Sequence, residues 1–211
     1  MTGPKLLKTL ERPFFATIEP LVGSLVRTGI RPNTITTIGT LLVVVSAVGY
    51  AFGMIRMGGL FLLLSGVVDT LDGQVARQTG RATKFGAFYD STLDRVGDGA
   101  TFIGIGWYLM TTGDAVAWRD VAVLLCMLGV LASLLVSYAR ARAEGLGLEC
   151  KVGIAQRAER ILGLGLLTLV VGAGPRALVL EAVVLVLTLL STITVVQRFV
   201  YVYQVTGAAG D

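Results

Sequence analysis

Five of the 14 acidic residues lie between positions 69 and 98, and their spacing points to a shared task. Asp69 and Asp72 are three residues apart and Asp90 and Asp94 are four apart, so each pair shares one face of a helix. Converging carboxylates beside apolar runs would repel one another and take up protons unless a cation neutralised them. Because all-oxygen ligands suit Mg²⁺ or Mn²⁺, the four residues predict a divalent-metal centre of one or two ions.

A salt-bridge network or an ion pathway would also account for acids at these positions. In the first case they would pair with nearby basic side chains, namely Arg77, Arg81, Lys84 and Arg95, and in the second they would line a channel or transporter. Gly73 and Gly86 adjoin the acids and would let a helix or a ligand approach the backbone closely, which favours a binding site. A translocation site is expected near mid-span on several helices, whereas these acids cluster at one end of their apolar runs.

The composition places this centre in a membrane and excludes several kinds of chemistry. Of 211 residues, 54% are hydrophobic and 15% charged, and the mean hydropathy is +0.77, whereas soluble domains have about 25% charged residues. The chain has no His, which excludes His-ligated metals and imidazole bases. Its two scattered Cys make neither a disulfide framework nor a Cys-based zinc site. The sequence thus predicts an integral membrane protein that works with carboxylates and basic side chains.

The elements that must position the acids are transmembrane helices of about 20 apolar residues each. Six apolar runs qualify, two of them interrupted by acids: 34–55, 57–68 continuing through Asp69, 99–113 following Asp98, 121–139, 161–175 and 182–197. We therefore expect an all-α integral membrane fold with six transmembrane helices, forming a single domain over residues 1–211. Residues 5–18 are mildly amphipathic, which is compatible with a short interfacial helix or with a cytoplasmic tail of no fixed position.

The basic residues predict the orientation of this fold. Six spans leave only Arg56, Arg119 and Arg176 on one side, and the other 15 of the 18 Lys and Arg on the opposite side. By the positive-inside rule, the basic side is cytoplasmic. The sequence therefore predicts a multi-pass protein of the inner cell membrane, with both termini and the acid cluster on the cytoplasmic side.

The acidic stretch resembles the signature of the CDP-alcohol phosphotransferase family. It reads Asp69-x-x-Asp72-Gly73-x-x-Ala76-Arg77, then Gly86, Asp90 and Asp94, and all eight defining positions match at the family's spacing. The resemblance implies a transferase that breaks the pyrophosphate of a CDP-linked lipid when an alcohol attacks phosphorus and CMP leaves. It also implies that the four aspartates bind two metal ions and that Asp94 is the base for the acceptor hydroxyl.

The same resemblance implies which residues hold the CDP-lipid. Gly73 and Arg77 in the signature would contact the CDP group, and Thr83 corresponds to a further nucleotide contact. Upstream, Pro32-Asn33-Thr34-Ile35-Thr36 resembles the family's segment at the start of the first span, so Asn33, Thr34, Ile35 and Thr36 are expected to help.

Two basic segments bear on the acceptor. Residues 137–144 (Ser-Tyr-Ala-Arg-Ala-Arg-Ala-Glu) and 156–160 (Gln-Arg-Ala-Glu-Arg) are similar to segments of bacterial phosphatidylinositol phosphate synthases, a branch of the family. The resemblance assigns an acceptor-phosphate site to Ser137, Arg140, Arg142, Arg157 and Arg160, with Arg140 standing where Lys is usual. Guanidinium groups bind a phosphate dianion in a bidentate way. Ordinary positive-inside topology, with attraction to anionic lipid, is the alternative.

The expected reaction transfers the phosphatidyl group from CDP-diacylglycerol to inositol 1-phosphate, giving phosphatidylinositol phosphate and CMP. The alternatives are glycerol 3-phosphate or another alcohol as acceptor, an ether-linked archaeal-type CDP-lipid as donor, or a divalent-cation transporter. The resemblance further implies a homodimer in the lipid bilayer, and no nucleic-acid partner is expected.

Overall fold

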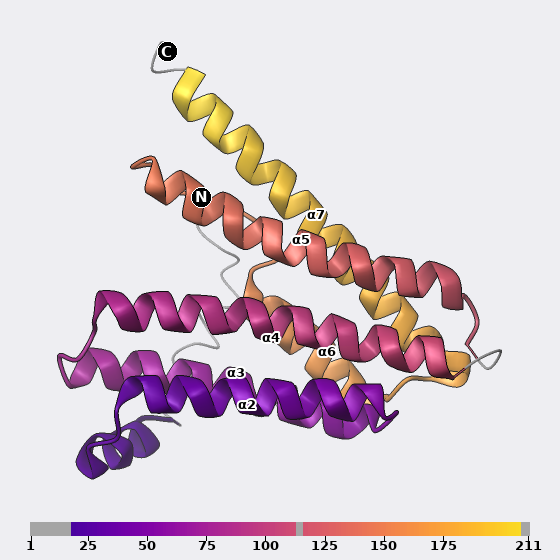
Figure 1. Ribbon diagram of the computed structural model, residues 1–211, viewed down its shortest axis with the longest axis horizontal. Coiled ribbons are helices and arrows are strands. Elements are labelled where there is room, and N and C mark those ends of the chain that lie inside the picture. Colours follow the sequence, from indigo (N-terminus) through magenta and orange to yellow (C-terminus); the bar gives the residue numbers. More distant parts are fainter. Residues whose placement is uncertain (1–17, 113–115, 208–211) are drawn as a thin grey trace.

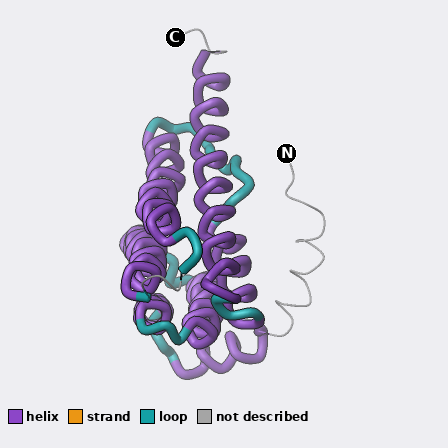
Figure 2. The backbone as a smooth tube through the Cα atoms, turned by 90° about the vertical axis from the view of Figure 1, so that its right-hand side faces the viewer, coloured by secondary structure: helices purple, strands orange, loops and turns teal. Residues whose placement is uncertain are grey.

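The computed structural model describes residues 18–112 and 116–207, and this part of the chain is helical without any strand (Figure 2). The helices are α2 (Pro32–Ala51), α3 (Ile55–Gln78), α4 (Lys84–Thr111), α5 (Arg119–Gly145), α6 (Arg157–Val170) and α7 (Leu178–Gly207), with a short 3₁₀ turn, η2 (Pro175–Ala177). The expected all-α fold is confirmed. Residues 18–28 are also helical, whereas most of the amphipathic segment 5–18 lies outside the described residues.

The six helices occupy the positions of the six predicted spans. Four of them are long and apolar enough to cross a membrane: Pro32–Ala51, Ile55–Gln78, Arg119–Gly145 and Pro175–Gly207. The protein is therefore a multi-pass membrane protein. α4 carries several charges in its first half, and α6 has 14 residues, or about 21 Å against a hydrocarbon core of about 30 Å. A count of six spans thus remains a prediction.

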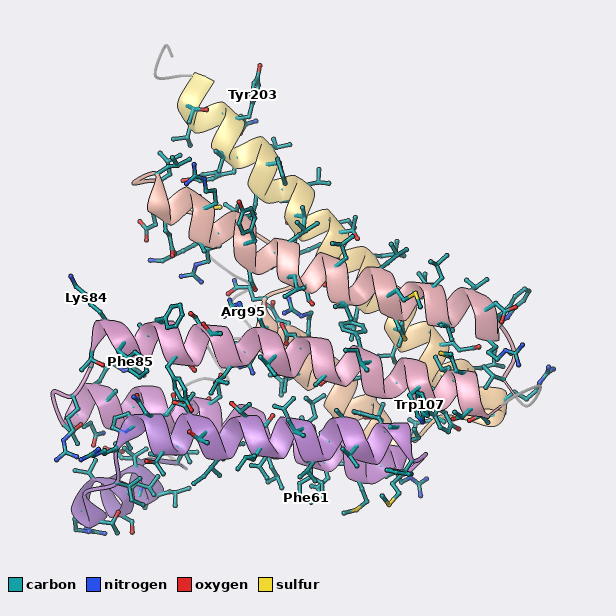
Figure 3. All side chains as sticks on the ribbon, viewed as in Figure 1. Phe61, Lys84, Phe85, Arg95, Trp107 and Tyr203 are labelled. Carbon is teal, nitrogen blue, oxygen red and sulfur yellow. The ribbon has the colours of Figure 1, made fainter. Side chains whose placement is uncertain are left out.

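Short connections bring the acids to one end of the bundle. α2 packs against both α3 and α4, and the short connections 52–54 and 79–83 reverse the direction of the chain between consecutive helices (Figure 1). The second half of α3 therefore lies beside the first half of α4 and the start of α2. In Figure 3, Lys84 and Phe85 mark this end of α4, and Trp107 lies towards the opposite end.

α6 packs closely against α3. A Cβ on Gly59 would lie 2.5 Å from Thr168 Oγ1 and 2.7 Å from the Gly165 carbonyl oxygen, so only glycine fits at this crossing. Tyr50 Oη shares a hydrogen bond of 2.8 Å with the same Thr168 hydroxyl. These contacts link α2, α3 and α6 and determine how far the start of α6 reaches towards the acids.

Candidate active site

Three of the predicted metal ligands converge. Asp69 and Asp72 on α3 and Asp90 on α4 each offer a carboxylate oxygen, and these oxygens lie within 4.8 Å of one another. Asp72 is buried, and its Oδ2 accepts a hydrogen bond of 2.5 Å from Thr36 Oγ1 on α2. Asp90 Oδ1 is buried and has no hydrogen-bond partner among the described residues. Clustered carboxylates with an unsatisfied buried oxygen fit a hard divalent cation.

Asp94, the fourth predicted ligand, lies one helical turn further along α4 and is held by arginines. Its Oδ1 is 2.9 Å from Arg157 Nη1, and its Oδ2 is 3.6 Å from Arg95 Nη1. The same Arg157 nitrogen is 2.8 Å from Asp69 Oδ2. Arg157 therefore bridges the cluster of Asp69, Asp72 and Asp90 and the predicted base Asp94. Of the four basic partners named in the salt-bridge alternative, Arg95 contacts Asp94, but the shorter contact to Asp94 comes from Arg157 on α6.

A cavity of about 170 Å³ adjoins the acids and is lined by Asp72 and Asp90. Five of the seven predicted CDP-lipid contacts also line it: Asn33, Thr36, Gly73, Arg77 and Thr83. The structure does not place the other two there. Thr34 is exposed, and Ile35 is buried in an apolar cluster with Leu71 and Val75.

Two helix N-termini face this cavity. α2 begins at Pro32, a residue favoured in the first helical turn, and α4 begins after Thr83, whose Oγ1 accepts a hydrogen bond of 2.9 Å from Gly86 N. A Cβ on Gly86 would lie 3.1 Å from Thr83 Oγ1 and 3.2 Å from Asn33 Oδ1, so a larger residue would crowd both side chains. Because helix N-termini carry free N–H groups and partial positive charge, the cavity suits an anion such as a pyrophosphate.

The predicted acceptor residues divide into two groups. Arg157 and Arg160, at the start of α6, lie against the acids, and Arg160 is buried. Arg140 on α5 pairs with Glu144 of the same helix at 2.8 Å. Two others do not reach the acids through any contact that the structure records: Ser137 is half-buried, and Arg142 is exposed in the last turn of α5.

Arg198 on α7 is a further candidate for the acceptor-phosphate site. The sequence marks it only as one of the basic residues on the predicted cytoplasmic side. Its Nε donates a hydrogen bond of 3.0 Å to the Val152 carbonyl and its Nη1 donates to the Val136 carbonyl, and the residue is 4% exposed. The charges of Arg140 and Arg160 lie close enough to interact with it. Arg140 on α5 and Arg160 on α6 therefore both lie near Arg198 on α7. A single charged residue between the apolar run 182–197 and the apolar residues 199–201 is the signal that could have marked Arg198.

Comparisons with known proteins show the family to which the chain belongs. The family model for CDP-alcohol phosphatidyltransferase matches residues 30–203, and the chain belongs to that family. The chain is 42% identical over 196 residues to the archaetidylinositol phosphate synthase of Methanothermobacter thermautotrophicus, covering 89% of each chain. It is 38% identical over 194 residues to the phosphatidylinositol phosphate synthase of Cutibacterium acnes, covering 88% of this chain and 91% of that one.

A solved relative has the same fold. The crystal structure of Mycobacterium tuberculosis phosphatidylinositol phosphate synthase with CDP-DAG bound superposes with a TM-score of 0.75 at 32% identity, covering 87% of this chain and 92% of that one. The same relative in complex with manganese and citrate gives a TM-score of 0.76 at 31% identity, covering 87% and 88%. That relative thus carries a divalent metal, and the aspartates of this chain could hold one.

Proposed function

We propose that this enzyme transfers the phosphatidyl group of CDP-diacylglycerol to inositol 1-phosphate, producing phosphatidylinositol phosphate and CMP. The observation that carries the proposal is the position of Arg157, which contacts both Asp69 and Asp94. A phosphate-binding side chain next to the proposed base is what a phosphorylated acceptor needs. The names of two relatives, an archaetidylinositol phosphate synthase and a phosphatidylinositol phosphate synthase, support this acceptor.

The donor would occupy the cavity at the start of α2 and α4. In this proposal Asn33, Gly73, Arg77 and Thr83 surround the CDP group, and the pyrophosphate lies towards Asp72 and Asp90. The acyl chains would extend sideways into the bilayer, so only the head group needs polar surroundings. Thr34 and Ile35 would act indirectly, by fixing the start of α2.

The acceptor would approach from the α6 side. Arg157 and Arg160 would bind its phosphate, with Ser137, Arg140 and Arg142 of α5 as the further predicted contacts. Asp94 would take the proton of the acceptor hydroxyl as the hydroxyl oxygen bonds to the lipid-bearing phosphorus. The bond from that phosphorus to the CMP oxygen breaks, and CMP leaves with the electron pair.

Asp69, Asp72, Asp90 and Asp94 are the proposed ligands of a two-ion Mg²⁺ centre, with Mn²⁺ as an alternative metal. Bound divalent cations neutralise the pyrophosphate and the departing CMP, which lowers the barrier to phosphoryl transfer. The unsatisfied Asp90 Oδ1 supports a metal at this place.

An acceptor comparison tests the function. Purified protein in lipid nanodiscs would receive Mg²⁺ and CDP-diacylglycerol, or an ether-linked archaeal-type CDP-lipid, with inositol 1-phosphate, glycerol 3-phosphate or free inositol, and CMP release would be followed. We expect CMP with inositol 1-phosphate and little with the others. CMP with glycerol 3-phosphate alone would contradict the acceptor, and no CMP with any pair would contradict the transferase. The two donor arms decide the lipid class.

We further propose six spans in the inner membrane, with both termini and the site cytoplasmic, an interfacial N-terminal helix, and a homodimer. Cysteine labelling tests the orientation. In a background without Cys126 and Cys150, a membrane-impermeant maleimide added to intact spheroplasts should label Trp118→Cys and leave Lys151→Cys unlabelled until the cells are lysed. Both residues are exposed, and Trp118 directly precedes α5 whereas Lys151 follows its opposite end. The reverse pattern would contradict the orientation.

A further inference from the structure

Asp98 lies on the same face of α4 as Asp90 and Asp94, at successive four-residue steps, yet it does not join the acid cluster. Eight residues separate it from Asp90, which is about 12 Å along the helix. Its Oδ2 accepts a hydrogen bond from Arg160 Nη2, and its Oδ1 is 3.7 Å from Arg157 Nε. The third acid of the row therefore faces the arginines of α6.

The pair of Asp98 and Arg160 is enclosed. Their side chains are 11% and 7% exposed, and Arg160 Nη1 also donates a hydrogen bond of 3.0 Å to the Ala155 carbonyl. A buried guanidinium held at two points has a fixed direction, because each bond removes rotational freedom. Removing either partner would leave an uncompensated charge in a low-dielectric environment.

Arg157 is held differently from Arg160. Its Nη1 forms ion pairs with Asp69 and Asp94. Its Nε is buried and has no hydrogen-bond partner in the described part of the chain. The 3.7 Å to Asp98 Oδ1 is an electrostatic contact but too long for a hydrogen bond. The Nε donor is thus oriented by the charge of Asp98 and remains free to bind an oxygen of a ligand.

We propose that Asp98 is a positioning residue for the acceptor-phosphate site: its carboxylate orients Arg157 and Arg160 together so that their remaining N–H donors meet the phosphate. This inference rests on the proposed function. Asp98 touches neither substrate nor metal in this arrangement. Loss of its charge would release Arg160 from its fixed direction and leave Arg157 oriented by Asp69 and Asp94 alone. Phosphate binding would weaken, while the CDP cavity would keep its lining.

The test compares Asp98→Asn with wild type in steady-state CMP release. Asn preserves the shape and removes the charge that orients two arginines, so we expect the acceptor KM to rise about 10- to 100-fold. The KM for the CDP-lipid should stay within about twofold, because the donor cavity does not include Asp98. The inhibition constant of inorganic phosphate against the acceptor should rise by the same factor as the KM, because the defect lies in phosphate binding.

A conservative variant and a matched control complete the test. Asp98→Glu keeps the charge and should recover part of the acceptor affinity, and it serves as the test variant if Asp98→Asn does not fold. Asp120→Asn, an exposed acid at the start of α5, should leave both KM values unchanged. An unchanged acceptor KM in Asp98→Asn, or equal rises in both KM values, would overturn the proposal.

Failure of the proposed function would be visible separately, since wild type itself would then show no CMP with inositol 1-phosphate. In that case the thermal unfolding of wild type and Asp98→Asn would be measured with inorganic phosphate alone. Stabilisation of wild type but not of the variant supports the role of Asp98. Equal stabilisation, or none in either protein, contradicts it.

Discussion

Replacing Asp94 by Asn is expected to lower kcat at least about 1000-fold, because the variant keeps a side chain of the same shape but no base for the acceptor proton. Asp94 is suited to this role by its surroundings. Arg157 and Arg95 hold its two oxygens at 2.9 and 3.6 Å, and the other three aspartates form the tighter group of oxygens. The Asn Oδ1 can still accept a hydrogen bond from Arg157, so the local structure should persist.

Binding measurements separate this loss of chemistry from a loss of structure. The variant should bind CDP-diacylglycerol within about threefold of wild type and unfold at a similar temperature, because Asp94 does not line the donor cavity. Asp120→Asn makes the same chemical change at an exposed position and should be fully active. Turnover of Asp94→Asn near the wild-type rate would exclude Asp94 as the base.

Replacing Arg157 by Ala should raise the acceptor KM at least about 100-fold, since several charge-assisted hydrogen bonds to the acceptor phosphate would be lost. Arg157→Lys keeps the charge without the fork of donors, so its KM should be intermediate. Lys151→Ala removes a positive charge that is paired with Glu149 at the surface and is the control; its kinetics should match wild type. CMP release with varied acceptor measures all three.

The same variant has a second expected effect that does not depend on turnover. Arg157 neutralises Asp69 and Asp94 through contacts of 2.8 and 2.9 Å, so it competes with a divalent cation for the same negative charge. Without it, Mn²⁺ should bind about five- to tenfold more tightly in the absence of substrates, as followed by electron paramagnetic resonance. Weaker Mn²⁺ binding would show instead that Arg157 holds the acids in place for the metal.

Much of the acid cluster was predictable because its spacing is local. Residues three or four apart on a helix share a face whatever the helix packs against, so Asp69 with Asp72 and Asp90 with Asp94 follow from the sequence. The short segment 79–83 turns the chain back so that α4 starts beside the end of α3, and α2 packs against both helices, which brings Asp90 to the α3 acids. Hydropathy likewise predicts the helices, since a membrane admits few other spanning structures.

The donor residues were predictable in part, and the exceptions have a physical reason. Neighbouring positions on a helix point in different directions, so a contiguous segment cannot all face one cavity. Asn33 and Thr36 line the cavity, whereas Thr34 points to the exterior and Ile35 into the core. The resemblance identified the segment, and the helical turn decides which of its residues face the cavity.

The sequence by itself determined the chemistry: an enzyme of the membrane, without imidazole, built on four aspartates at helical spacing and a set of arginines. Only the tertiary structure decided which arginines meet which acids. Arg157 reaches Asp69 and Arg160 reaches Asp98 because α6 crosses α3 at Gly59, where no side chain separates the helices. These partners lie 88 and 62 positions apart in the sequence, so their contact depends on the packing of whole helices and not on any local pattern.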